Sequence, residues 1–171
     1  MDDYDRALRW ASLGSYVAIS VLIYRYRHWI KRLAGWGYLG IFLASLLGNA
    51  TLLLPAPVLA LALVEGKYLN PYGVGGASAA GATLGELTGY LAGYGGQAFV
   101  DHEQYPQLQQ WLDDYGFAAI VTLAAVPNPV FDVVGILAGL NHYPLHLFVA
   151  ATFLGKLVKF TAVALFGKAV L

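Results

Sequence analysis

Two long apolar stretches of this chain are each interrupted by a pair of prolines. The stretches cover residues 37–64 and 116–140 and contain few polar residues. Proline lacks a backbone N–H and disfavours helix at the residue before it, so a regular helix through either stretch is disfavoured. We expect a helix, a break and a second short helix in each, as a re-entrant hairpin or a broken span; one tilted helix is the alternative for 37–64. The predicted breaks lie at Pro55, Pro57, Pro127 and Pro129.

The composition indicates an integral membrane protein. Hydrophobic residues make up 58% of the chain and charged residues 12%, and the mean hydropathy is +0.59. A soluble domain is about 45–50% apolar and about 25% charged. The formal net charge is zero, which argues against a nucleic-acid partner, and the absence of cysteine excludes disulfides and thiolate chemistry.

Local similarities suggest that the chain contains two copies of one unit. Asn70-Pro71-Tyr72 corresponds to Asn141-His142-Tyr143, and Leu84-Gly85-Glu86-Leu87 corresponds to Leu154-Gly155-Lys156-Leu157. We therefore predict an all-α integral membrane fold of two inverted-type repeats, each a proline-broken re-entrant hairpin followed by a transmembrane helix. The repeats would cover 35–100 and 115–171, joined by an acidic amphipathic linker over 101–114.

The N-terminal part, residues 1–34, is predicted to form a separate apolar or interfacial helix over 7–24, followed by a basic loop. Acidic residues at its start favour a retained helix over a cleaved signal peptide. The loop 25–32 holds two-fifths of the basic residues and is expected on the cytoplasmic side. The expected location is the inner (plasma) membrane of a prokaryote.

Four ionisable residues lie in apolar segments. Charge is costly there, so each of these residues is by default a candidate functional residue. A pairing of Glu86 or Asp132 with Lys156 or Lys159 would reduce that cost. One alternative is a buried ion pair that only fixes packing. The other is that the two lysines lie nearer the interface and extend their ammonium groups to it.

Two asparagines, Asn49 and Asn128, lie near the breaks. They would either line a hydrated cavity between facing hairpins or satisfy backbone groups that the prolines free. Together with the four ionisable residues, they are the candidate substrate and transport residues.

Small residues recur at every fourth position along one predicted helix face, which permits close helix contact in lipid. This glycine face is predicted to serve helix packing. It consists of Gly81, Gly85, Gly89 and Gly93.

No arrangement of residues indicates an enzyme, a metal site or a cofactor. The four histidines are scattered, and although His142 and His146 have the spacing of helical metal ligands, Pro144 lies between them. Gly95-Gly96 closes a predicted helix, whereas a phosphate-binding loop would open one.

Two motifs carry a resemblance to a known family. The run GELTGYLAGYGG at 85–96 resembles the Gly-acid-x-x-x-Tyr-x-x-Gly-x-x-Gly signature of the DedA / VTT-domain superfamily (SNARE-associated Golgi protein-like). The run VPNPVFDVVG at 126–135, followed by Ala138-Gly139, is similar to its second hairpin and closest to the small YqaA-like branch. The resemblance covers residues 35–165.

The resemblance implies two re-entrant hairpins facing each other across the membrane, and movement of phospholipid or polyprenyl phosphate between leaflets. It places Glu86 at the family's helix acid and Asp132 in the second hairpin. Typical bacterial members also carry acids in the first hairpin, which is without them here, and two arginines where this chain has Ala124 and about Val130. These departures favour a less selective scramblase, or a transporter of another substrate.

The expected function is thus flippase- or scramblase-type lipid translocation. The expected partners are membrane lipids, with protons and a second copy of the chain as further candidates. A proton-coupled small-solute or ion transporter is one alternative. A non-transporting membrane assembly subunit, whose glycine face binds a partner, is the other.

Overall fold

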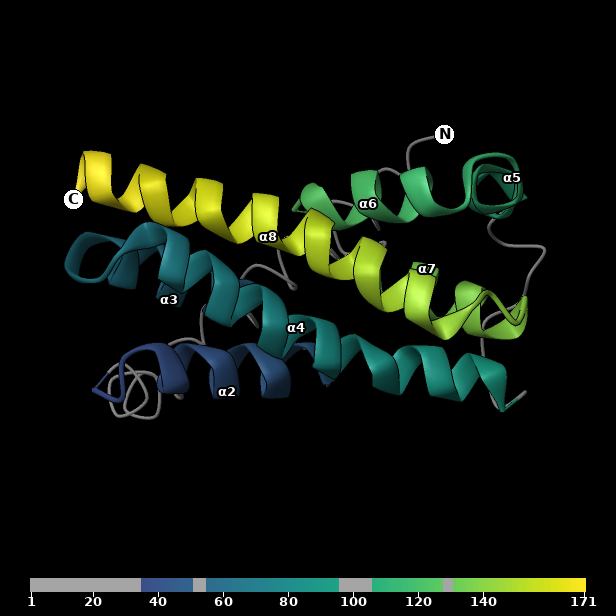
Figure 1. The fold of residues 1–171 in the computed structure, drawn as a ribbon, viewed down its shortest axis with the longest axis horizontal. Helices are drawn as coiled ribbons and strands as arrows, with labels where there is room; N and C mark the ends of the chain where they lie inside the picture. The colour runs from purple at the N-terminus through teal and green to yellow at the C-terminus, as the bar shows by residue number, and fades with distance from the viewer. Residues whose placement is uncertain (1–34, 51–54, 96–105, 128–130) are drawn as a thin grey trace, which may run out of the picture.

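The computed structural model describes residues 35–50, 55–95, 106–127 and 131–171, and every regular element in these ranges is an α-helix (Figure 1). This confirms the all-α prediction. The N-terminal helix, the basic loop 25–32, Asn128 and Pro129 lie outside the described residues. The helices are α2 (Tyr38–Ala50), α3 (Pro55–Tyr68), α4 (Pro71–Tyr94), α5 (Pro106–Tyr115), α6 (Phe117–Ala125), α7 (Phe131–Leu140) and α8 (Leu145–Val170).

Two long antiparallel helices, α4 and α8, form the centre of the fold. Gly75 lies against Thr161, and farther along α4 the Tyr90 ring lies 5.0 Å from the Phe148 ring. Their lengths of 24 and 26 residues correspond to about 36 and 39 Å, enough for a hydrocarbon layer of about 30 Å. Among the described helices, α8 alone combines the length and the hydropathy of a membrane span.

Four short helices pack along this centre in two pairs, one at each end (Figure 1). In the first pair α2 meets α4 at Gly85, and α3 meets α8 at Gly167. In the second pair α7 meets α4 at Gly93, and α6 meets α8 at Gly155. These helices contain 9 to 14 residues and are about 14–21 Å long, too short to cross the hydrocarbon layer alone.

Each apolar stretch holds two separate helices, and the first proline of its pair opens the second helix or lies between the two. Helix α2 ends at Ala50 and α3 begins at Pro55; α6 ends at Ala125 and α7 begins at Phe131. Pro55 opens a helix because the first turn does not need the missing N–H. Both short-helix pairs therefore change direction near the middle of α4 and α8 (Figure 1).

The glycine face of α4 packs against two different helices of the same chain. A Cβ atom at Gly81 would collide with the carbonyl of Phe42 in α2, and one at Gly93 with the carbonyl of Ile136 in α7. Gly85 also lies against α2, whereas Gly89 has looser contacts with α7. Because the chain's own helices cover this face, it is not the partner surface expected of an assembly subunit.

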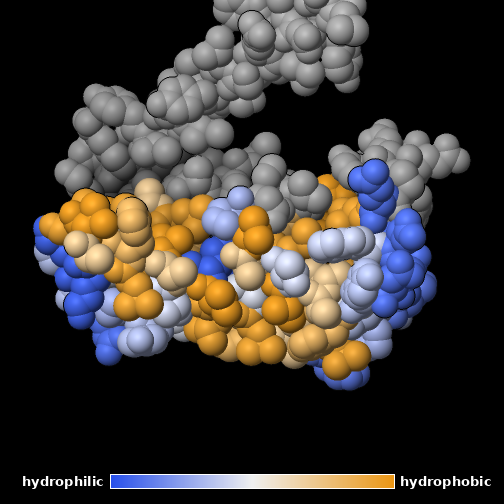
Figure 2. Space-filling model, turned by 90° about the horizontal axis from the view of Figure 1, so that it is seen from above, coloured by the Kyte–Doolittle hydropathy of each residue, from blue (hydrophilic) through white to orange (hydrophobic). Residues whose placement is uncertain are grey.

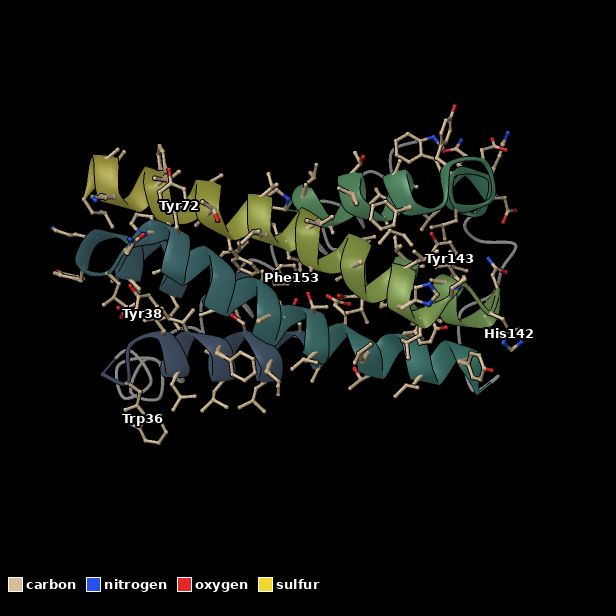
Figure 3. The ribbon with its side chains drawn as sticks, in the orientation of Figure 1. Trp36, Tyr38, Tyr72, His142, Tyr143 and Phe153 are labelled. Atoms are coloured by element: carbon tan, nitrogen blue, oxygen red, sulfur yellow. The ribbon has the colours of Figure 1, made fainter. Side chains whose placement is uncertain are left out.

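The visible surface has an apolar belt between two hydrophilic ends (Figure 2). We name the ends after residues labelled in Figure 3: the Tyr72 end, which also holds Trp36 and Tyr38, and the His142 end. Exposed aromatic rings gather at both ends, as is typical of the two membrane interfaces. They are Trp36, Tyr38, Tyr68 and Tyr72 at one end, and Tyr94, Trp111 and Tyr115 at the other.

Candidate functional site

A buried ion pair joins the two long helices near their middles. Oε1 of Glu86, on α4, lies 2.6 Å from Nζ of Lys156, on α8, and the side chains are 3% and 2% exposed. The two residues hold corresponding places in the two suggested repeats. Their pairing confirms one of the predicted combinations, and the burial of Lys156 shows that its ammonium does not extend to the interface.

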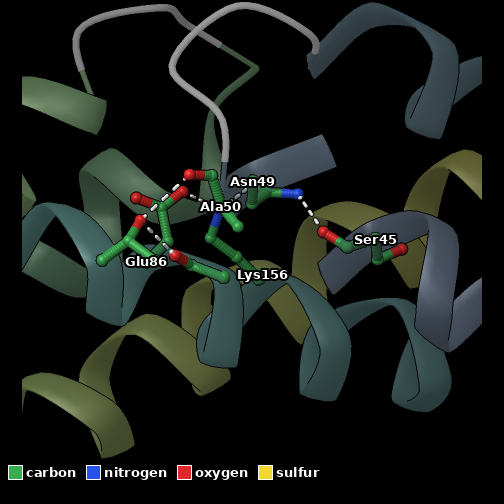
Figure 4. A network of polar contacts seen from close by, with 7 residues as sticks. Ser45, Asn49, Ala50, Glu86 and Lys156 are labelled. Atoms are coloured by element: carbon green, nitrogen blue, oxygen red, sulfur yellow. Dashed lines mark hydrogen bonds and ion pairs between the residues drawn. The ribbon is translucent and has the colours of Figure 1, made fainter. Parts of the chain in front are cut away.

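The end of α2 is bound to this ion pair (Figure 4). Nζ of Lys156 donates a 2.7 Å hydrogen bond to Oδ1 of Asn49, whose Nδ2 donates to the carbonyl of Ser45 at 2.8 Å. The hydroxyl of Thr88 on α4 donates to the carbonyl of Ala50 at 3.1 Å. The last turn of α2 is thus held by side chains of both long helices.

Helix α7 covers the other side of the ion pair. The ring of Phe131, its first residue, lies 5.0 Å from Nζ of Lys156, close enough for a cation–π attraction. A Cβ atom at Gly135 would lie 3.7 Å from Oε2 of Glu86, so the carboxylate has the α7 backbone beside it. Four helices, α2, α4, α7 and α8, therefore enclose the charges.

Two further charged residues complete the site. Asp132 on α7 and Lys159 on α8 are partly buried, and each interacts electrostatically with Glu86 and Lys156 as well as with the other. Two acids and two lysines balance, which lowers the cost of holding charge in an apolar layer. We call Asn49, Glu86, Asp132, Lys156 and Lys159 the central polar network.

Three hydroxyls that the residue patterns did not single out each lie one helical turn before a network residue on the same helix. They are buried, and among the described residues none of them has a hydrogen-bond partner. Water commonly fills this role for buried polar groups, so they are candidate water ligands beside the ion pair. The spacing of three or four residues could have identified them. They are Ser45, Thr83 and Thr152.

The chemistry open to this site is the binding of polar groups and the movement of protons. Within the described ranges no group of three or more His, Cys, Asp or Glu side chains could hold a metal ion. The network offers acceptors on Glu86 and Asp132 and donors on the two lysines. A polar group that entered the apolar layer here would find both negatively charged acceptors and positively charged donors.

Over the described residues, these features define a helical membrane protein with a charged network at the middle of its long helices. A family profile for the VTT domain matches residues 54–169, most of the chain, and the protein belongs to the VTT domain family. This is a family of membrane proteins associated with lipid or solute transport. No curated protein and no solved structure matches the chain.

Proposed function

We propose that the protein moves lipid between the two leaflets through facing re-entrant hairpins, α2–α3 and α6–α7. The observation that carries this proposal is the position of the central polar network, where short helices from opposite ends of the fold stop beside a buried ion pair. A lipid headgroup crosses an apolar layer only at high cost unless polar groups replace its water. The network supplies such groups at mid-depth.

In this mechanism the headgroup moves past the network while the acyl chains stay in the surrounding lipid. Asn49 and Asp132 would contact the headgroup where the hairpins face each other. The Glu86–Lys156 pair would open to offer a charge of the required sign. The three unpartnered hydroxyls would hold water along the route.

A phospholipid of broad headgroup type suits this route better than a polyprenyl phosphate. Arginine binds phosphate with two parallel hydrogen bonds, and the chain has no arginine after Arg32. Lys156 and Lys159 offer point charges instead. On the resemblance of its second hairpin, we place the chain in the small YqaA-like branch of the family.

The same proposal puts the protein in a prokaryotic inner membrane with the Tyr72 end in the cytoplasm. Residues 25–32 precede α2, which begins at this end. Lys67 and Lys168 lie there as well, in the last turns of α3 and α8, whereas Asp113 and Asp114 are on α5 at the His142 end. This distribution agrees with the positive-inside rule.

The test is to reconstitute the protein in liposomes that carry a fluorescent phospholipid in both leaflets, and to add a membrane-impermeant quencher. We expect signal loss beyond that of protein-free vesicles, in which only the outer leaflet is quenched. Glu86→Gln and Asp132→Asn should slow the additional loss. Glu65→Gln, at a buried acid of α3 outside the network, is the matched control and should leave the additional loss unchanged.

Loss limited to the outer leaflet with the folded wild-type protein would refute general phospholipid movement. Wild-type rates in folded Glu86→Gln and Asp132→Asn variants would refute the site assignment instead.

A proton-coupled solute or ion transporter is the second candidate. The observation that favours it is the placement of Asp132 and Lys159 beside the ion pair, because adjacent acids and lysines can pass a proton between them. Uptake that depends on a pH gradient, and that Glu86→Gln abolishes, would support it. Lipid exchange at the same rate with and without a gradient would argue against it.

A further inference from the structure

An open groove runs along the outside of α8 within the apolar belt, away from the central polar network. Its volume is about 520 Å³, and its walls are almost wholly apolar. Tyr72, at the start of α4, closes one side, and its position beside α8 is seen in Figure 3. The residues of α8 that line the groove are Leu157, Val158, Thr161, Ala162 and Leu165.

A second hollow continues this groove at the Tyr72 end. It has a volume of about 330 Å³ and shares Tyr72 and Leu165 with the groove. Lys67 and Lys168 both line it, and none of its lining residues is acidic. An apolar channel in the membrane belt therefore opens into a basic hollow at the interface.

The two lysines have donors to offer a ligand. Nζ of Lys67 donates one hydrogen bond, 2.5 Å long, to the backbone oxygen of Leu171, and an ammonium group carries three donors. Lys168 is exposed, and the described residues make no hydrogen bond or ion pair with it. Exposed lysines at a membrane surface attract anionic lipid.

We propose that the groove and the basic hollow together bind one anionic phospholipid. One acyl chain would lie along α8 beside Val158 and Ala162, and the headgroup phosphate would meet Lys67 and Lys168. The order of the two hollows, apolar in the belt and basic at the interface, matches the order of chain and headgroup in a phospholipid. This site is separate from the translocation route and holds whether or not the protein transports lipid.

The headgroup is tested by native mass spectrometry of the full chain, purified in micelles with equal amounts of phosphatidylglycerol and phosphatidylcholine of identical acyl chains. We expect preferential retention of one phosphatidylglycerol. Lys67→Gln with Lys168→Gln should reduce this preference by about fivefold for each lysine. Lys67→Arg with Lys168→Arg keeps both charges and should keep the preference. An unchanged preference in the glutamine pair would overturn the proposal.

The acyl groove is tested by filling it. Ala162→Trp, at an exposed position of α8, should lower retention of both lipids, whereas Leu154→Trp, on the same helix outside the groove, should not. Equal retention in the two variants would exclude the groove. Displacement by free glycerol phosphate as effective as by whole lipid would show an anion site in place of a lipid site.

Retention and leaflet exchange are separate measurements, so the two proposals can fail independently. Loss of exchange with phosphatidylglycerol retention intact would refute only the transport proposal. Intact leaflet exchange without preferential phosphatidylglycerol retention would refute only the lipid site.

Discussion

The side-chain oxygen of Asn49 and the ammonium of Lys156 lie 2.7 Å apart, so the lysine that neutralises Glu86 also holds the end of α2. One buried cation thereby connects a short helix to both long ones. Stability and the proposed transport therefore depend on the same contacts.

The Glu86–Lys156 pair should behave as one unit in a double-mutant cycle. Removing one partner leaves an uncompensated buried charge, and we expect Lys156→Met or Glu86→Gln alone to lower the free energy of unfolding by about 3–5 kcal/mol. The double variant should lose less than the sum of the two. Thermal unfolding in detergent measures this, and strict additivity would show that the charges do not interact.

Loss of the Asn49 amide should destabilise the protein less than loss of Lys156. Asn49→Leu removes a hydrogen bond to a charged group, for which we expect a cost of about 1.5–3 kcal/mol. The control is Thr122→Val, because the Thr122 hydroxyl bonds only the Ala118 carbonyl of its own helix and is exposed. The same thermal unfolding measurement applies, and equal effects of both substitutions would contradict the assigned contact.

The crossing of α4 and α7 should not tolerate a methyl group. A Cβ atom at Gly93 would collide with the carbonyl of Ile136, and one at Gly139 with the carbonyl of Tyr90. We expect Gly93→Ala and Gly139→Ala each to cost about 1–3 kcal/mol. Gly76→Ala on α4 is the control, since nothing lies within 4 Å of its added carbon and helix propensity favours alanine by about 1 kcal/mol. Equal melting temperatures of these two variants and the Gly76→Ala control would show that α4 and α7 leave room for a methyl group where they cross.

Tyr90→Phe should weaken the His142 end of the fold. The Tyr90 hydroxyl donates a 2.5 Å hydrogen bond to the carbonyl of Tyr143, between α7 and α8, and its removal should cost about 1 kcal/mol. Tyr94→Phe is the control: its ring stacks on Tyr90 at 6.1 Å, but the described residues offer its hydroxyl no hydrogen bond. Hydrogen exchange of the α7–α8 connection should rise in the first variant only.

The helical segments and part of the site could largely be predicted from the sequence. Proline chemistry acts locally, so the interruptions at Pro55 and Pro127 were accessible without a structure. The cost of buried charge predicted that Glu86 or Asp132 would pair with Lys156 or Lys159, and the structure contains one of these pairs, Glu86 with Lys156.

Contacts between helices that are far apart in the sequence were harder to predict. Helical periodicity shows that Gly81 and Gly93 share a face, but not that different helices cover its two halves. The bond from Lys156 to Asn49 depends on where α2 ends in space, which residue spacing does not reveal. Helix α8 begins at Leu145, where Pro144 occupies the position just before its first turn.

The end of α2 at Ala50 has an electrostatic consequence for the ion pair beside it. A helix carries partial negative charge at its carboxyl end and partial positive charge at its amino end. The carboxyl end of α2 meets the ammonium of Lys156 through the side chain of Asn49. The buried ammonium thus lies at a helix end whose backbone dipole has the opposite sign, and the half-length α2 acts as a fixed counter-charge in the middle of the layer.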